Sequence, residues 1–122
     1  DANLFNFIFY TLTQVKAYLD INTSFIKSST IPIDHTLKAE KKVIAICKAR
    51  NADVYVNPIG GIELYTKDEF KNQGIDLYFL KADGFEYKQF NNGFIPWLSI
   101  IDVMMFNSKE TITNMLMQYS LR

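Results

Sequence analysis

The sequence predicts an α/β fold: a small parallel sheet of about three strands with helices packed on its faces. Helical and strand-like segments alternate along the chain, and each predicted strand is followed by a helix. Connections of that length are too long for hairpins and favour right-handed parallel crossovers. The chain has 122 residues, 48% of them hydrophobic, which suits one buried core. We therefore expect a single α/β domain over residues 1–122.

Composition and charge exclude several classes of protein. Thirteen basic residues balance thirteen acidic ones, so no net field would draw the chain to nucleic acid or an anionic membrane. Cys47 is the only cysteine, which excludes a disulfide framework and a cysteine-cluster metal site. No apolar run approaches the roughly 18 residues of a membrane span, and the first residues lack the features of a signal peptide. We expect a cytoplasmic protein.

The first half of the chain predicts a helix, a strand and a second helix. One face of the first helix carries apolar residues at spacings of four, three and four: Ile8, Leu12, Val15 and Leu19. Asn22 follows as a stop, and residues 24–28, with β-branched and aromatic side chains, are a predicted strand. The second helix is capped by Asp34 or Thr36 and ends at Asn51. Its apolar face consists of Leu37, Val43, Ile44 and Cys47.

The middle of the chain predicts a strand, a short helix and another strand. Residues 52–56 form a short apolar run before a Pro-Gly loop, as expected for a strand buried on both faces. Thr66 and Glu69 have the spacing of a helix capping box, and Gly74 supplies a left-handed stop. Residues 75–80 are the third predicted strand.

The last third predicts a loop and two helices. Residues 81–93 are polar, contain glycine and form a loop. Pro96 is well placed as the first residue of a helix through "WLSIIDVMMF" that ends at Asn107. Ser108 caps a final helix. Its apolar face consists of Ile112, Met115, Leu116 and Tyr119.

Two further features favour a piece of a longer protein. Three strands make a thin sheet with two edges to protect. The chain also begins inside an apolar segment, without an initiator methionine. We expect upstream sequence to cover an edge or an apolar patch, and an uncovered patch of that kind would favour a homodimer.

Ligands of open parallel sheets bind beyond the carboxyl ends of the strands. Three predicted loops should meet on that rim: residues 28–30, 57–61 and 81–89. Gly60 and Gly61 can adopt positive φ or let the backbone approach a ligand, and Asn57 offers neutral hydrogen bonds to a sugar or phosphate. The alternative is a tight connection in which Asn-Pro starts a turn and Gly-Gly ends it.

Other candidate residues carry weaker signals. Asp102 lies among apolar residues, where a buried carboxylate must be paired or bound; the alternative is a solvent-facing position on an amphipathic helix. His35 suits a surface position and Cys47 an inert buried thiol. Trp97 and residues 104–106 are expected in the core rather than in a ligand site. No Ser-His-Asp set, metal cluster or close acid pair can be assembled from spacing, and no cofactor is identified.

Two stretches carry a resemblance to a known family: "YVNPIGGIELYTKDEFKNQGIDLYFL" and "YKQFNNGFIPWLSIIDVMMFN". They resemble the WbqC-like family, bacterial proteins associated with O-antigen (lipopolysaccharide) biosynthesis and proposed to include glycine transferases. The resemblance covers residues 24–121 and is most specific over residues 55–107; the first helix is similar only in character. Family members carry an amino-terminal half with a "QPYFFPY"-like segment that is not found here. The resemblance therefore implies the carboxyl-terminal half alone.

The residues that match the family pattern are Asn57, Pro58, Gly60, Gly61, Tyr65, Phe70, Gly74, Tyr87, Gln89, Pro96, Ser99, Asp102 and Asn107. The resemblance implies a transferase that moves an aminoacyl group, glycyl in the first instance, to the amine of a sugar. Such a reaction needs an activated acyl donor, a base for the amine and hydrogen bonds to the developing oxyanion. Matches at fixed spacing also favour a ligand-holding loop at residues 57–61 over a plain turn.

The resemblance gives each candidate residue a role. Asp102 is the candidate base or orienting acid. The candidates for phosphate or oxyanion contacts are Asn57 and the amides of Gly60 and Gly61. The candidates for holding the sugar are Tyr65, Tyr87 and Gln89. The alternative is a non-catalytic module that binds a nucleotide sugar or a partner enzyme at the same rim; a nucleotidyl-transfer ancestry would rest on analogy of fold alone.

Overall fold

The computed structural model describes residues 3–91 and 93–122, which divide into two compact units. The first unit contains the described residues up to Ser24 together with Gly84–Gln118. The second contains Phe25–Asp83 and Tyr119–Arg122. The chain therefore passes from the first unit to the second, returns to the first, and adds one more strand to the second. That residues 1–122 form a single domain stays a prediction.

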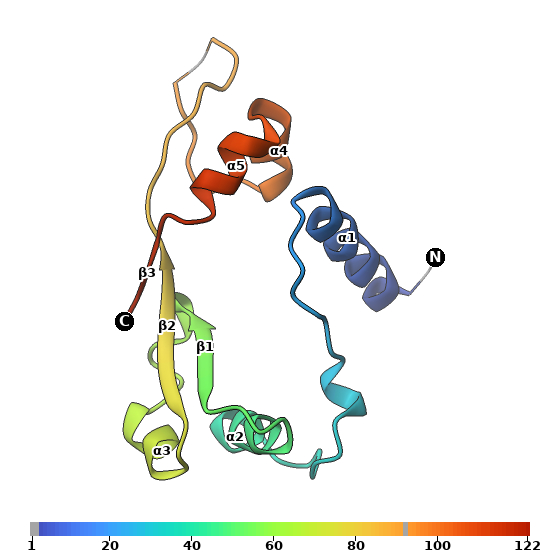
Figure 1. Ribbon diagram of the computed structural model, residues 1–122, viewed down its shortest axis with the longest axis vertical. Helices are drawn as coiled ribbons and strands as arrows, with labels where there is room; N and C mark the ends of the chain where they lie inside the picture. The colour runs from blue at the N-terminus through green and yellow to red at the C-terminus, as the bar shows by residue number, and fades with distance from the viewer. Residues whose placement is uncertain (1–2, 92) are drawn as a thin grey trace. The chain divides into compact units, whose positions relative to one another are not determined.

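The second unit contains a three-stranded mixed sheet in the order β1-β2-β3 (Figure 1). Its strands are β1 (Val54–Pro58), β2 (Asp76–Ala82) and β3 (Tyr119–Leu121). β1 and β2 are parallel, with Val54 opposite Asp76, and β3 runs antiparallel to β2, with Leu121 opposite Leu80. The α/β class and the parallel pair are confirmed. The expectation of three parallel strands is wrong, because the third strand comes from the end of the chain.

The core of the second unit lies on one face of this sheet. Two helices contribute to it, α2 (Ala39–Ala49) and α3 (Lys67–Asn72). The buried residues of the cluster are Ile44, Cys47, Phe70, Ile75, Leu77 and Phe79. The aromatic rings of Tyr55 and Tyr65 pack against it from the partly buried shell. Helices and sheet thus share one hydrophobic cluster, as the alternating sequence pattern predicts.

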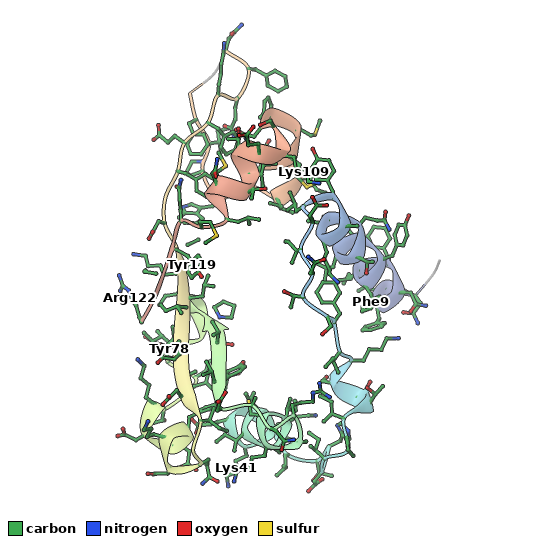
Figure 2. All side chains as sticks on the ribbon, in the orientation of Figure 1. Phe9, Lys41, Tyr78, Lys109, Tyr119 and Arg122 are labelled. Carbon is green, nitrogen blue, oxygen red and sulfur yellow. The ribbon has the colours of Figure 1, made fainter. Side chains whose placement is uncertain are left out.

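The opposite face of the sheet is exposed. Successive residues of a strand point to opposite faces, so the following residues share this side: Val54, Val56, Tyr78, Leu80, Tyr119 and Leu121. Tyr78 and Tyr119 are labelled on their strands in Figure 2. Val54 and Val56 are 47% and 42% exposed. The expectation that the strand at residues 52–56 is buried on both faces is therefore wrong.

Three helices end in the same way, with a residue at positive φ. In α3 the Gly74 amide donates to the Lys71 carbonyl at 2.9 Å and the Ile75 amide to the Phe70 carbonyl at 3.0 Å. This pair of bonds is the Schellman motif, and Gly74 has φ 76°. Asp20 (φ 54°) closes α1 (Leu4–Tyr18) and Asn51 (φ 52°) closes α2 through equivalent bonds. The predicted Gly74 stop is confirmed.

The predicted capping box of α3 is wrong. Thr66 is the N-cap, but its side chain makes no capping bond. The Thr66 amide instead donates to Glu40 Oε1 of α2 at 2.6 Å, which is the role that local spacing assigned to Glu69. A carboxylate from another helix therefore satisfies the start of α3 and ties α2 to it.

The first predicted strand, residues 24–28, is also wrong. The described structure has no β-strand at these residues; the chain there is exposed and enters a short 3-10 turn, η1 (Ser28–Thr30). Asp34 then accepts hydrogen bonds from the Thr36 amide at 2.9 Å and the Thr36 hydroxyl at 2.7 Å. Neither residue caps α2, whose N-cap is Lys38. β-branched composition supplies a preference for strand but cannot supply a pairing partner.

The first unit contains α1 and two short helices that contact each other, α4 (Ile100–Phe106) and α5 (Lys109–Met115). The Ser99 hydroxyl accepts from the Ile101 amide at 3.2 Å, so α4 begins at Ile100 and the expected start at Pro96 is wrong. Asn107 as the C-cap of α4 and Ser108 as the N-cap of α5 are confirmed. Lys109 pairs with Asp20, linking α5 to the end of α1 at 2.5 Å.

Several apolar expectations fail in the first unit. No residue of α1 is buried, although the helix forms where the spacing predicts it. Trp97 is 79% exposed with φ 60°, and Met105 is also exposed, so the expectation of a core position fails for both. The last helix ends at Met115, and Tyr119, which was expected on its apolar face, belongs to β3. Long-range strand pairing overrides the helical spacing at that point.

Phe70 should be the most sensitive position of the second unit. Its side chain is fully buried, so Phe70→Ala should lower the free energy of unfolding by about 3–5 kcal/mol, the usual cost of such a cavity. Chemical denaturation followed by far-ultraviolet circular dichroism measures this. Ile62→Ala, at an exposed position of the same unit, is the control and should cost less than about 1 kcal/mol. Equal costs for the two variants would contradict the assigned core.

Candidate functional site

The loop after β1 is organised by the side chain of Asn57. The Tyr55 hydroxyl donates to Asn57 Oδ1 at 2.9 Å, and Asn57 Nδ2 donates to the Pro58 carbonyl at 3.1 Å. Tyr55 and Asn57 are two residues apart on a strand and share its core-facing side. The chain then turns through η2 (Ile59–Gly61). Asn57 is therefore held in one orientation by its neighbours.

Three aromatic rings pack together where this loop meets the hydrophobic core. The Tyr55 ring stacks on Phe70 with centroids 5.6 Å apart, and Tyr65 packs edge-on to both, at 6.1 Å from Tyr55 and 5.9 Å from Phe70. Burial, together with the neighbouring Tyr65, raises the pKa of the Tyr55 hydroxyl. Tyr55 therefore stays protonated at neutral pH and remains a donor to Asn57. Tyr65 therefore belongs to this aromatic cluster through the contacts of its ring.

The two glycines of the loop have different surroundings. Neither has positive φ, since Gly74 is the one described glycine with that conformation. A Cβ at Gly61 would lie 2.1 Å from Asn57 Nδ2, whereas a Cβ at Gly60 would meet open space. Gly61 is thus required by the close approach of the Asn57 amide. The packing of Asn57 against Gly61 is a structural reason for a glycine at this position, as the plain-turn interpretation expects. A ligand contact at this loop stays a proposal.

A second polar group surrounds Asp102 in the first unit. Asp102 lies on α4 and is partly buried. Its Oδ2 atom accepts hydrogen bonds from the Tyr87 hydroxyl at 2.6 Å and from Gln89 Nε2 at 2.9 Å. Within residues 3–91 and 93–122, no hydrogen bond to Oδ1 is found. Of the two alternatives that the sequence left open for Asp102, the structure shows the paired carboxylate, and this pairing uses one of its two oxygens.

Gln89 connects Asp102 to the backbone of the following loop. It is 7% exposed, and its amide makes further bonds beyond the carboxylate. Gln89 Oε1 accepts from the Ile95 amide at 2.7 Å, and Nε2 also donates to the Ile95 carbonyl at 3.2 Å. The side chain thereby pairs with Ile95 as a strand backbone would and closes the loop between the two residues.

Aromatic rings enclose Tyr87 on several sides. Phe94 packs edge-on with ring centroids 5.1 Å apart, and Phe85 and Phe106 each lie at 6.4 Å. The hydrogen bond to the Asp102 carboxylate raises the pKa of the Tyr87 hydroxyl, because ionisation would remove the donor and place two negative charges together. Tyr87 therefore remains a neutral donor at physiological pH.

The predicted site residues fall into two groups, one on each unit. Tyr87, Gln89 and Asp102 form one hydrogen-bonded group, and the second contains Asn57, Gly61 and Tyr65. Gly60 lies beside the second group without side-chain neighbours. Sequence reasoning missed Tyr55 and the backbone of Ile95. The two-residue spacing of Tyr55 to Asn57, repeated at Tyr87 to Gln89, is the signal that could have found the first.

Other potential chemical groups lie apart from these two. His35 is exposed and its Nε2 hydrogen-bonds the Ile31 carbonyl at 3.0 Å, as expected for a surface position. Burial raises the pKa of Cys47, so the thiol stays protonated in the core. Across the described ranges no His, Cys, Asp and Glu side chains gather as a metal site. None of the helices described has the length and apolar character needed to cross a bilayer.

Comparison with known protein families identifies the family of this chain. The sequence model of the WbqC-like protein family matches residues 1–114. The chain belongs to the WbqC-like family. The match of this WbqC-like chain contains both polar groups, and it extends over α1, which resembled the family only in character. Neither a curated protein nor a solved structure matches the chain.

The two glycines of the WbqC-like loop form a matched pair of variants. Gly61→Ala should displace the Asn57 amide and lower the free energy of unfolding by about 1–3 kcal/mol through the lost hydrogen bonds. Gly60→Ala adds the same methyl group in open space and should be neutral within about 1 kcal/mol. Thermal and chemical unfolding of the two proteins measure the difference. Equal stabilities would contradict the close packing of Gly61 against Asn57.

The Tyr87–Asp102 hydrogen bond should be visible as a titration. Asp102→Asn should move the pKa of Tyr87 down toward the ordinary value of about 10. Because the folded-state pKa of Tyr87 is raised, the stability that this bond contributes is present below about pH 10 and is lost as pH rises through that pKa. Carbon-13 NMR of labelled tyrosines, assigned with Tyr87→Phe, measures the pKa. Glu110→Gln is the control, and an unchanged Tyr87 pKa in Asp102→Asn would rule out this bond as the cause.

Proposed function

We propose that this WbqC-like chain takes part in aminoacyl transfer, with glycine as the acyl group, to the amine of a sugar during the synthesis of O-antigen or a related surface polysaccharide. The substrate class comes from the resemblance of two stretches of the sequence to the WbqC-like family. The proposed reaction takes place in the cytoplasm. The proposal also includes an amino-terminal half of the same protein that acts together with this chain. The observation that supports a role in chemistry is the arrangement around Asp102.

The hydrogen bonding of the Asp102 carboxylate suits a basic ligand. Oδ2 is occupied by two donors, whereas Oδ1 is not used by any described residue. A partly buried carboxylate of this kind attracts an ammonium group more strongly than an exposed one does, because screening by water is reduced. Tyr87 remains neutral beside it, so the negative charge of the group is that of Asp102. The arrangement suits recognition of a sugar amine.

The same oxygen can act as a base in the transfer step. Oδ1 of Asp102 first accepts a proton from the bound ammonium, which leaves a neutral amine with a free electron pair. The amine nitrogen then attacks the carbonyl carbon of an activated aminoacyl donor and forms a new C–N bond. The bond from that carbon to the leaving group breaks, and the leaving group departs with the electron pair and with the second proton that the nitrogen loses. The carboxylate is therefore proposed first to bind the amine and then to deprotonate it.

The Asn57 loop is proposed to bind a polar ligand on its own unit. Gly60 is exposed, and the space that a Cβ would occupy there is open, so a phosphate or a carbonyl oxygen is proposed to approach the loop at this residue. Asn57 and Gly61 support that loop by packing against each other. Tyr65, packed on Tyr55 and Phe70, offers an aromatic surface for the sugar.

A second candidate function is a binding module that forms no bond. It is favoured by the position of Cys47, whose thiol is buried in the core and held protonated by its raised pKa. Covalent transfer through that thiol would require it to be exposed and ionised. In this alternative Asp102 recognises the amine of a nucleotide sugar, and another protein performs the transfer.

The proposal is tested by titrating the full chain with D-glucosamine at mildly acidic pH, where the sugar amine is protonated, and following amide shifts by NMR. Shifts should appear around Asp102, and N-acetylglucosamine, which lacks the cation, should bind at least about tenfold more weakly. Asp102→Asn should weaken glucosamine binding by about tenfold or more, the value of a hydrogen bond to a charged group. Glu110→Gln removes an exposed carboxylate of the same unit and should leave glucosamine binding unchanged.

Equal affinities for glucosamine in the original chain and in Asp102→Asn would refute the role of Asp102. Glucosamine binding at Asp102 without aminoacyl transfer, in a protein supplied with an activated glycine donor, would favour the binding module over the transferase.

A further inference from the structure

Both N–H donors of Gln89 are engaged within the protein. Its Oε1 accepts from the Ile95 amide, and its Nε2 donates to Asp102 Oδ2 and to the Ile95 carbonyl, with Tyr87 Oη at 3.4 Å. The side chain is also almost fully buried. A residue that contacts a sugar would need a free donor or acceptor at the surface. The contacts of Gln89 are instead directed inward, toward Asp102 and the loop backbone.

The position of the second donor to Asp102 matters for the orientation of the carboxylate. The terminal torsion of an Asp side chain is broad and roughly two-fold, so one donor leaves the group free to turn. Tyr87 and Gln89 approach the same oxygen from two residues of one segment, at 2.6 and 2.9 Å. Two donors on Oδ2 hold that oxygen in place, and the direction of Oδ1 is then set as well.

The loop bonds of Gln89 hold the donor itself in place. Ile95 is bonded to the Gln89 amide through both its N–H and its carbonyl. Four residues later Ser99 caps α4, the helix that carries Asp102. The segment that leads into α4 is therefore fixed at Ile95 and at Ser99. Gln89 thus couples the start of α4 to the carboxylate three residues beyond the cap.

We propose that Gln89 is a positioning residue, which fixes Asp102 through Oδ2 so that Oδ1 is presented to the amine of the ligand. This inference rests on the proposed function and replaces the contact with sugar that the family resemblance implied for Gln89. Tyr87 is the second donor and shares the task. Asp102 remains the group that touches the amine.

The test uses Gln89→Met, which keeps the length of the side chain and removes its donors and acceptor. The Gln89 contact holds the pKa of Tyr87 down, whereas the Asp102 contact raises it. Without Gln89, Tyr87 becomes the one remaining side-chain donor to Asp102, and its pKa should rise further. Carbon-13 NMR of labelled tyrosines measures this, and glucosamine affinity of the same protein should fall about tenfold through the lost bond to a charged group.

Asn91→Met is the matched control, because it removes an exposed amide from the same loop. Gln89→Glu is a second variant that keeps the length. Its protonated acid donates one hydrogen bond, so glucosamine affinity should recover at acidic pH and be lost as the acid ionises. The titratable groups on this segment are Tyr87 and the exposed Glu86 and Lys88, with Asp102 facing it from α4.

The outcomes separate this inference from the proposed function. An unchanged Tyr87 pKa in Gln89→Met overturns the positioning role, since the contacts of Gln89 with Tyr87 and Asp102 would then have no effect on this group. Unchanged glucosamine affinity in Gln89→Met, with weakened binding in Asp102→Asn, overturns it as well and leaves the proposed function intact. Unchanged glucosamine affinity in Asp102→Asn overturns the proposed function and the presentation of Oδ1 with it.

Discussion

The burial of Phe70 is the constraint on which the second unit depends. The ring is fully buried, stacks on Tyr55 and meets the edge of Tyr65. The backbone of the same residue closes α3 by accepting the Ile75 amide at 3.0 Å. The backbone of Phe70 therefore closes α3 just before β2 begins. Its ring packs against Tyr55, which in turn orients Asn57 through a hydrogen bond. The order of the loop follows from the packing of the core beneath it.

The first unit depends on polar contacts more than on burial. α4 and α5 are short, and Ile112 is the one buried residue among α1, α4 and α5. The buried amide of Gln89 makes hydrogen bonds to Asp102 and to Ile95, and aromatic rings pack around Tyr87. Hydrogen bonds to a charged group in such surroundings contribute more than bonds at an exposed surface. A polar network of this kind sets geometry with fewer residues than a hydrophobic core needs.

A carboxylate with one oxygen held and the other open is also what a group that binds an amine requires. Tyr87 and Gln89 hold Oδ2 of Asp102, and the proposed function assigns the amine to Oδ1. Membership of the WbqC-like family gives this arrangement a chemical context in the proposed transfer of an aminoacyl group. The exposed apolar face of the sheet, with Val56 and Tyr78, is a separate feature of the second unit.

Local sequence determined the features that depend on near neighbours. The Gly74 stop and the Ser108 cap follow from spacing and residue type. The parallel pair β1–β2 follows from the alternation of strands and helices along the chain. Tertiary structure decided the features that need a distant partner. The Glu40 cap on Thr66 spans 26 residues, and β3 forms only because β2 offers an edge. The one-sided burial of β1 and the inward direction of Gln89 were decided in the same way, since burial and hydrogen bonding depend on what the folded chain brings alongside.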